Sequence, residues 1–337
     1  MAFSWKHAAI ALGVVVGLLV FAYGALFFVP APAREPVWGA HFSKAHAEYL
    51  KLDWRATYLA LLDEVGVRRL RLGAYWNELE PQPGTFRFDD LDWMLAEADA
   101  RGAKVLLAVG RRLPRWPECH VPDWARARAE SEQRAALHVY LTTVVTRYRT
   151  HPAVVMWQVE NEPFLGVFGE CPPGDGDFLA TEIAAVRALD TTRSILVTDS
   201  GELSSWMRSA AAGDRLGHTL YRTVWNPWFG YISYDRVLPS ALYRLKAWLA
   251  GKPAAQMMVA ELQAEPWIAR GDLFAMPIAE QRRSMDATQF AKNVTFAREV
   301  GFPEVYLWGT EYWYWLRTVG GDASLWESAR ALFRGSR

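Results

Sequence analysis

The feature that most constrains the fold of this chain is an eightfold alternation of short, β-rich apolar runs with longer helical stretches. Such an alternation is typical of βα units arranged around a parallel sheet. The predicted strands span residues 37–42, 69–72, 104–109, 154–158, 195–198, 216–221, 256–260 and 304–307.

Helical stretches with apolar residues at three- and four-residue spacing lie between these runs. They span residues 58–64, 91–101, 130–149, 178–190, 242–250 and 284–300. Gly66, Gly102, Gly251 and Gly301 follow four of them, each shortly before a predicted strand. Glycine just past a helix end provides the left-handed residue that caps it, so the glycines support the predicted boundaries.

Eight strand-helix units favour a closed (β/α)8 TIM barrel in the α/β class. A doubly wound open sheet is the alternative, but no Gly-x-Gly-x-x-Gly turn follows the first predicted strand to support a dinucleotide site. In a barrel, the chemistry lies where strands end and βα loops begin.

Carboxylates lie at two of these strand ends. Glu160 and Glu162 follow the fourth predicted strand, and Glu261 and Glu265 follow the seventh. Two carboxylates about 5 to 5.5 Å apart can hydrolyse a glycosidic bond with retention, one as nucleophile and the other as acid and then base. The pair needs two environments, because one carboxyl must stay protonated while the other stays ionised.

Two motifs at these ends carry a resemblance. Asn161-Glu162-Pro163 ends the fourth strand, and a glutamate ends the seventh. The segment that begins at Arg71 passes a Trp, a Glu-Pro and a Pro-Gly before a helix. Together they resemble the superfamily of retaining (β/α)8 glycoside hydrolases, which includes cellulases, mannanases and β-galactosidases. The likeness extends from Val37 to about Trp315.

The resemblance implies a role for five residues. Glu162 would be the general acid/base and Glu261 the nucleophile. Asn161 would contact the sugar hydroxyl next to the reacting carbon. Arg71 resembles the arginine that keeps the nucleophile ionised, and Tyr221 resembles the tyrosine that donates a hydrogen bond to it.

Each assignment has an alternative. Glu160 competes with Glu162, because residues two apart on a strand share a face. Glu265 competes with Glu261 in the same way. Arg71 and Tyr221 have purely structural alternatives, as an ion-pair partner and as a barrel-lining side chain.

The chain contains 17 tryptophans, and the eighth predicted strand ends in an aromatic segment. By resemblance, Trp308 is the platform under the reacting sugar, since an exposed indole covers the C–H face of a pyranose. Glu311 is expected either to bind substrate hydroxyls or to stay solvated. Trp225 and Trp228 are expected to extend the cleft.

The N-terminus is a separate segment. Residues 8–29 carry no charge and are long enough to span about 30 Å of hydrocarbon. They predict a transmembrane anchor between a short cytoplasmic N-terminus (1–7) and a linker (30–35), with the catalytic domain (36–337) outside the cytoplasm. A cleaved secretory signal is the alternative, with Lys6 as its charged leader.

Charge and cysteine content exclude several classes of protein. The 37 basic and 37 acidic side chains give a net charge of zero, which argues against a nucleic-acid partner. Two cysteines cannot form a disulfide-dense scaffold. The histidines show no metal-binding motif, so no metal is expected, and no other cofactor is expected either. Cys119 and Cys171 follow neighbouring strands and are candidates for one disulfide, with two unrelated thiols as the alternative.

These observations predict a membrane-anchored, extracytoplasmic retaining glycosidase that acts on a carbohydrate with β-linkages. The alternatives are a non-catalytic carbohydrate-binding or scaffold protein on the same fold, and a transglycosylase. The residues after Glu261 are Leu-Gln-Ala-Glu-Pro-Trp instead of the aromatic-Gly pair of cellulase-like members, so the sugar and linkage stay open, as does the oligomeric state.

Overall fold

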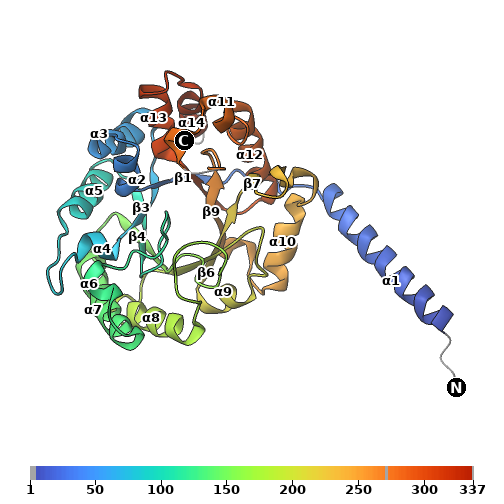
Figure 1. Ribbon diagram of the computed structural model, residues 1–337, viewed down its shortest axis with the longest axis horizontal. Helices are drawn as coiled ribbons and strands as arrows, with labels where there is room; N and C mark the ends of the chain where they lie inside the picture. Colours follow the sequence, from blue (N-terminus) through green and yellow to red (C-terminus); the bar gives the residue numbers. More distant parts are fainter. Residues whose placement is uncertain (1–4, 270–271, 336–337) are drawn as a thin grey trace.

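The computed structural model describes residues 5–269 and 272–335. Eight parallel strands form a closed barrel in the order β1-β10-β9-β6-β5-β4-β3-β2, with helices around it (Figure 1). The barrel strands are β1 (Val37–Phe42), β2 (Arg69–Gly73), β3 (Lys104–Val109), β4 (Val154–Val159), β5 (Ile195–Asp199), β6 (Arg215–Leu220), β9 (Met257–Gln263) and β10 (Glu304–Trp308). The predicted TIM barrel is confirmed.

The helices of the barrel domain follow the strands in the expected alternation. They are α2 (Lys44–Tyr49), α3 (Trp54–Ala60), α4 (Trp76–Leu79), α5 (Asp89–Ala100), α6 (Asp123–Arg126), α7 (Glu130–Tyr148), α8 (Gly176–Leu189), α9 (Met207–Ala212), α10 (Ser240–Leu249), α11 (Ile278–Gln281), α12 (Ala287–Val300), α13 (Thr310–Thr318) and α14 (Ser324–Gly335). A π-helical turn, Leu61–Val65, extends α3. The four glycines expected to end helices all have positive φ, between 65° and 88°.

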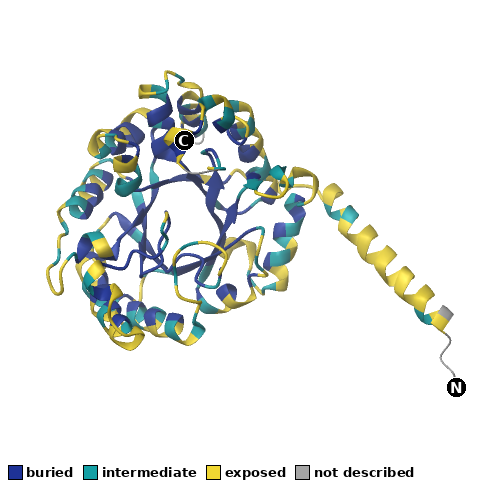
Figure 2. Ribbon diagram, in the orientation of Figure 1, coloured by how far each residue is buried: buried dark blue, intermediate teal, exposed yellow. Residues whose placement is uncertain are grey.

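The barrel is packed through its interior and does not enclose a channel. Leu106, Met156, Leu196, Met258 and Tyr306 form one buried cluster contributed by five strands. The strands are buried along almost their whole length, whereas the outer faces of the helices are exposed (Figure 2). Because the interior is filled, ligands have access only at the ends of the barrel.

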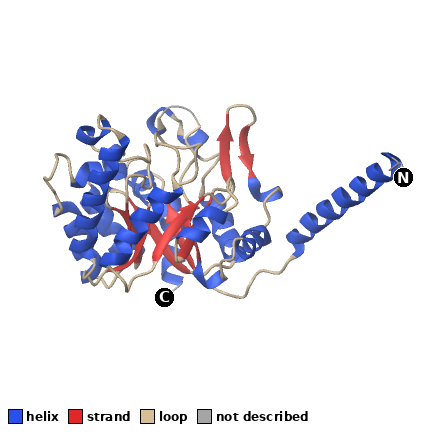
Figure 3. Ribbon diagram, turned by 90° about the horizontal axis from the view of Figure 1, so that it is seen from below, coloured by secondary structure: helices blue, strands red, loops and turns tan. Residues whose placement is uncertain are grey.

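An antiparallel hairpin departs from the simple βα repeat. Its strands, β7 (Thr223–Asn226) and β8 (Gly230–Ser233), follow β6 and form a separate sheet. The hairpin projects beyond the barrel (Figure 3).

The N-terminal helix α1 (Trp5–Ala25) extends away from the barrel (Figure 1). Residues 7–28 have a mean hydropathy of 2.5, and this segment is long and apolar enough to cross a membrane. Its most apolar window is entirely unburied. A membrane span and a signal sequence both have this length and composition.

Candidate active site

A cavity of about 890 Å³ lies at the carboxyl ends of the barrel strands. Its lining contains both glutamates on which the sequence resemblance rests, Glu162 and Glu261. The other carboxylates on its wall are Glu118, Glu202, Glu265 and Asp272, and its aromatic side chains include Tyr49, Trp116, Phe168, Tyr221, Trp225, Tyr234, Trp267 and Trp308.

Glu261 lies inside β9, which continues three residues beyond its predicted end. The guanidinium of Arg71 donates to Glu261 Oε1 from Nη1 at 2.8 Å. The hydroxyl of Tyr221 donates to the other carboxylate oxygen, Oε2, at 3.0 Å. Both oxygens of Glu261 therefore accept a hydrogen bond, which stabilises the ionised carboxylate.

Arg71 also fixes the residues at the end of β4. It is fully buried, and it donates from Nε to Gln158 Oε1 at 2.8 Å and from Nη2 to Asn161 Oδ1 at 2.7 Å. The amide nitrogen of Asn161 in turn donates to Glu118 Oε2 at 3.3 Å. One buried cation thus connects β2, β4 and β9 beneath the cavity.

Glu162 has the opposite environment from Glu261. Burial raises the pKa of its carboxyl well above the ordinary value, and the negative charges of Glu261 and Glu118 raise it further. Its backbone has a φ of +44° and its N–H donates to Thr198 Oγ1 at 2.9 Å. A non-glycine residue in this region is strained and is held by its surroundings, which is common at functional sites.

Glu160 does not line the cavity. Its two carboxylate oxygens accept from the backbone N–H groups of Arg111 and Arg112, at 2.8 and 2.7 Å. Glu160 therefore braces the loop after β3, and Glu162 is the glutamate of this segment that faces the cavity.

Glu265 lies on the cavity wall as the partner of Arg115. Burial opposes ionisation of Glu265, but the Arg115 charge and hydrogen bonds from His46 and Arg115 outweigh it and lower its pKa to about 2. Arg115 Nη1 lies 2.5 Å from Glu265 Oε1. Glu265 is thus held ionised by Arg115, whereas Glu261 is paired with Arg71.

Two predicted substrate-binding residues lie in unexpected surroundings. Glu311 is fully buried outside the cavity lining and pairs with Arg115 Nη2 at 2.8 Å, so it is not the solvated or substrate-facing side chain we expected. Trp308 lines the cavity, but the Arg115 guanidinium lies 4.0 Å from its ring centroid and the His41 ring lies 4.6 Å from it. Trp308 is only 8% exposed, so little of its indole is open to a sugar.

Comparisons with known proteins support the barrel fold. The model of the glycosyl hydrolases family 2 TIM barrel domain matches residues 89–222. Among solved structures, a β-galactosidase from the Antarctic haloarchaeon Halorubrum lacusprofundi is 16% identical with a TM-score of 0.60; the match covers 89% of this chain and 58% of the galactosidase. This chain thus spans little more than half of that protein.

Two further structures are similar. A GH5_18 protein from Streptomyces cattleya, solved in complex with GlcNAc, is 18% identical with a TM-score of 0.57 and coverages of 82% and 71%. A glycoside hydrolase family 5 mannosidase from Rhizomucor miehei is 16% identical with a TM-score of 0.54 and 80% coverage of each chain. This chain has the (β/α)8 barrel of the glycoside hydrolases. The predicted superfamily resemblance is confirmed.

The cavity wall contains three carboxylates that the sequence motifs did not indicate, Glu118, Glu202 and Asp272. Burial is the main cause that raises the pKa of both Glu118 and Glu202 to about 7, and the charge of Glu261 adds to the shift of Glu118. Glu118 precedes Cys119, and its φ is +71°. The one sequence signal for Glu118 was its position next to Cys119, a candidate disulfide cysteine near the barrel mouth.

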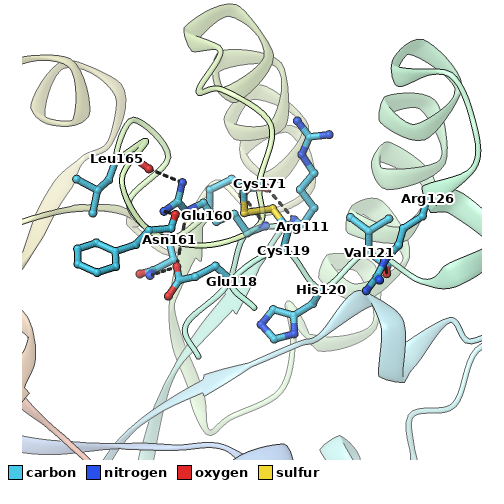
Figure 4. Close-up of a disulfide and its surroundings, with 12 residues drawn as sticks. Arg111, Glu118, Cys119, His120, Val121, Arg126, Glu160, Asn161, Leu165 and Cys171 are labelled. Atoms are coloured by element: carbon cyan, nitrogen blue, oxygen red, sulfur yellow. Dashed lines mark hydrogen bonds and ion pairs between the residues drawn. A yellow bond between two sulfur atoms is a disulfide. The ribbon is translucent and has the colours of Figure 1, made fainter. Parts of the chain in front are cut away.

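A disulfide joins Cys119 to Cys171 and connects the loops after β3 and β4 (Figure 4). Figure 4 also shows Glu118 and Asn161 beside this bridge. The disulfide therefore joins the loop that carries Glu118 to the loop that carries Glu162.

The hairpin contributes one wall of the cavity. Trp225, in β7, lines it as expected, together with Ile232 of β8. Trp228 lies at the hairpin turn, 85% exposed and outside the lining, so the structure does not place it in the cleft. In the described part of the chain, no group of three or more His, Cys, Asp or Glu side chains is arranged to hold a metal ion.

Proposed function

We propose that this protein is a retaining glycoside hydrolase that cleaves β-linked saccharides by double displacement, with Glu162 as acid/base and Glu261 as nucleophile. The observation that carries the proposal is the contrast between these two carboxyls in one cavity. Burial favours the protonated form of Glu162, whereas Arg71 and Tyr221 stabilise the ionised form of Glu261.

In the first step, the Glu261 carboxylate attacks the anomeric carbon while Glu162 donates its proton to the glycosidic oxygen. The bond to the leaving group breaks and a glycosyl ester forms on Glu261. In the second step, the Glu162 carboxylate takes a proton from water, which attacks the same carbon and releases Glu261. Arg71 and Tyr221 keep the carboxylate of Glu261 in place throughout.

The substrate class is proposed from the comparisons. The similar structures include a β-galactosidase, a mannosidase and complexes with GlcNAc or Manb1-4GlcNAc. A β-linked hexose or amino sugar is therefore the first class to screen. We further propose that the enzyme acts outside the cytoplasm, attached to the membrane by α1.

The test uses the full-length protein in detergent with aryl β-glucosides, β-galactosides, β-mannosides and β-N-acetylglucosaminides. Glu162→Gln and Glu261→Gln should each reduce kcat/KM for the cleaved substrate by at least ~100-fold. Glu78→Gln is the matched control, because Glu78 is a half-buried carboxyl in a separate pocket and its variant should retain activity.

Azide separates the two roles. With Glu261→Gly, azide should restore turnover and give a glycosyl azide of inverted configuration, whereas with Glu162→Gly it should give the retained configuration. If the folded wild-type protein binds the saccharides but cleaves none, a carbohydrate-binding protein replaces the hydrolase.

A further inference from the structure

One wall of the cavity is closed by an ion pair that crosses the barrel mouth. Arg115 lies in the loop after β3 and contacts Glu265, two residues past the end of β9. In the closed order of eight strands, β3 and β9 are four positions apart and therefore lie on opposite sides of the barrel. The bridge divides the mouth into a half over β4, β5 and β6 and a half over β2, β1 and β10.

Directly beside the bridge, the half over β2, β1 and β10 is filled with side chains. The hydroxyl of Tyr75, after β2, donates to the carbonyl of Pro114 at 3.0 Å and lies 3.2 Å from Ser43 Oγ, after β1. The N–H of Ser43 donates to Glu311, which also holds Arg115. These side chains separate the cavity that holds Glu162 and Glu261 from the smaller pocket at the ends of β1 and β2, which includes Leu72, Asn77 and Glu78 in its lining.

The outer edge of the same wall is joined as well. His46 Nε2 lies 3.5 Å from Glu265 Oε2, and the hydroxyl of Tyr49 donates to Asp272 Oδ1 at 2.5 Å. These contacts connect α2, after β1, with the loop after β9. Loops from three strands therefore form one continuous barrier around Arg115.

The chemistry determines which end of the substrate meets this barrier. Glu162 follows β4 and must reach the glycosidic oxygen, so the leaving group lies on the β4 side, where the hairpin and the loops after β4 and β5 line the cavity. The sugar that becomes attached to Glu261 points the other way, toward Arg115 and Glu265.

Building on the proposed function, we infer that the enzyme is exo-acting and releases sugar from the non-reducing end of its substrate, with Arg115 as the residue that closes the site. A saccharide continuing beyond the reacting sugar would have to displace the guanidinium from between Glu265, Glu311 and Trp308. Only the terminal sugar of a saccharide therefore fits beside Arg115.

The test compares free and capped chain ends on the full-length protein in detergent. The probes are the aryl β-glycosides named above, each with and without a 4,6-O-benzylidene cap, and tetrasaccharides of the cleaved sugar labelled at the reducing end. We expect the cap to reduce kcat/KM at least ~100-fold, and the labelled trisaccharide to be the first product.

A variant tests the role of Arg115 directly. Arg115 has a φ of +87°, a conformation that glycine adopts without strain, so Arg115→Gly removes the side chain at a position suited to glycine. It should raise kcat/KM for capped substrates at least tenfold over wild type. Arg101→Gly is the control, because Arg101 also pairs with two carboxylates but precedes β3, at the opposite end of the barrel.

Each result is decisive. Cleavage of capped glycosides, or of internal bonds, by the wild-type protein would overturn the exo inference and leave the hydrolase proposal standing. No cleavage of any uncapped glycoside or tetrasaccharide would overturn the hydrolase proposal itself. If the wild type requires a free end but folded Arg115→Gly does too, Arg115 is not the closing residue.

Discussion

At the residue scale, the carboxyls of this cavity differ because their surroundings differ. Arg115 lowers the pKa of Glu265 to about 2, whereas burial raises the pKa of Glu118 to about 7. Glu118 is close enough to both proposed catalytic residues for charge effects: its charge raises the pKa of Glu162, and the charge of Glu261 raises its own. Protonation of Glu162 is therefore coupled to the charge of Glu118.

This coupling predicts the pH dependence of a Glu118 variant. The folded pKa of Glu162 is raised, so its proton is available at low pH and is lost as pH rises through that pKa. Glu118→Gln removes one negative charge, lowers the pKa of Glu162 and should move the alkaline limb of kcat/KM to lower pH by roughly half a unit to one unit. The measurement is a pH profile on an aryl glycoside, with Glu78→Gln as control. If the alkaline limb of the Glu118→Gln profile is unchanged, the charge of Glu118 does not affect the pKa of Glu162.

The sequence indicated the proposed reacting pair but not the residues that shape the site. Glu162 and Glu261 were marked by a motif and by a strand end, and the contacts of Arg71 and Tyr221 with Glu261 lie where the resemblance places them. The contact of Arg115 with Glu265 spans 150 residues, and no local pattern reports such a pairing. For the same reason, the covering of Trp308 was not foreseen.

At the element scale, strand prediction succeeded where strands are apolar. The predicted and observed bounds of β1 and β3 are identical. The prediction for β9 ended at residue 260, whereas the strand runs to Gln263. Glu261 accepts hydrogen bonds from Arg71 and Tyr221, and Gln263 accepts one from the backbone N–H of Thr223. These polar side chains interrupt the apolar pattern from which a strand is predicted.

The loop after β4 has no helix or strand between Glu162 and Cys171, so the disulfide to the loop after β3 is a major constraint on it. Replacing Cys119 and Cys171 together with alanine should destabilise the domain by about 2–4 kcal/mol and lower its Tm by roughly 5–10 °C. Because the loops carry Glu118 and Glu162, kcat/KM should also fall about tenfold or more. Thermal melts and aryl glycoside kinetics measure both.

Wild-type protein treated with dithiothreitol serves as the comparison for the double variant, and the two should behave alike. A lower Tm with unchanged kcat/KM would indicate that other contacts position the loops. The bonds from Arg112 to the carbonyls of Leu165 and Phe168, at 2.6 and 3.0 Å, are the first candidates.

At the scale of the whole molecule, the linker between α1 and the barrel lies against the barrel helices. Arg244 of α10 donates to the carbonyl of Pro30 at 3.2 Å. The Glu35 carboxylate accepts from Arg298 of α12 at 2.9 Å and from the Trp38 indole at 2.8 Å. These contacts hold the linker against the barrel, so an uncleaved α1 would keep the barrel domain close to the membrane surface.

The anchor and the signal peptide make opposite predictions for the mature protein. If α1 is a membrane anchor with its N-terminus inside the cell, the full-length chain should stay in the membrane fraction after carbonate washing. About 20 apolar residues bind the hydrocarbon of the bilayer too strongly to be extracted. Protease added to intact cells should then degrade the barrel domain, since Lys6 and the N-terminal amine favour a cytoplasmic N-terminus. A matched chain in which residues 1–33 are replaced by a cleavable signal should instead be released. Recovery of the natural protein in soluble form, with its first residue at or near Arg34, would establish that the helix is removed and that the enzyme acts away from the membrane.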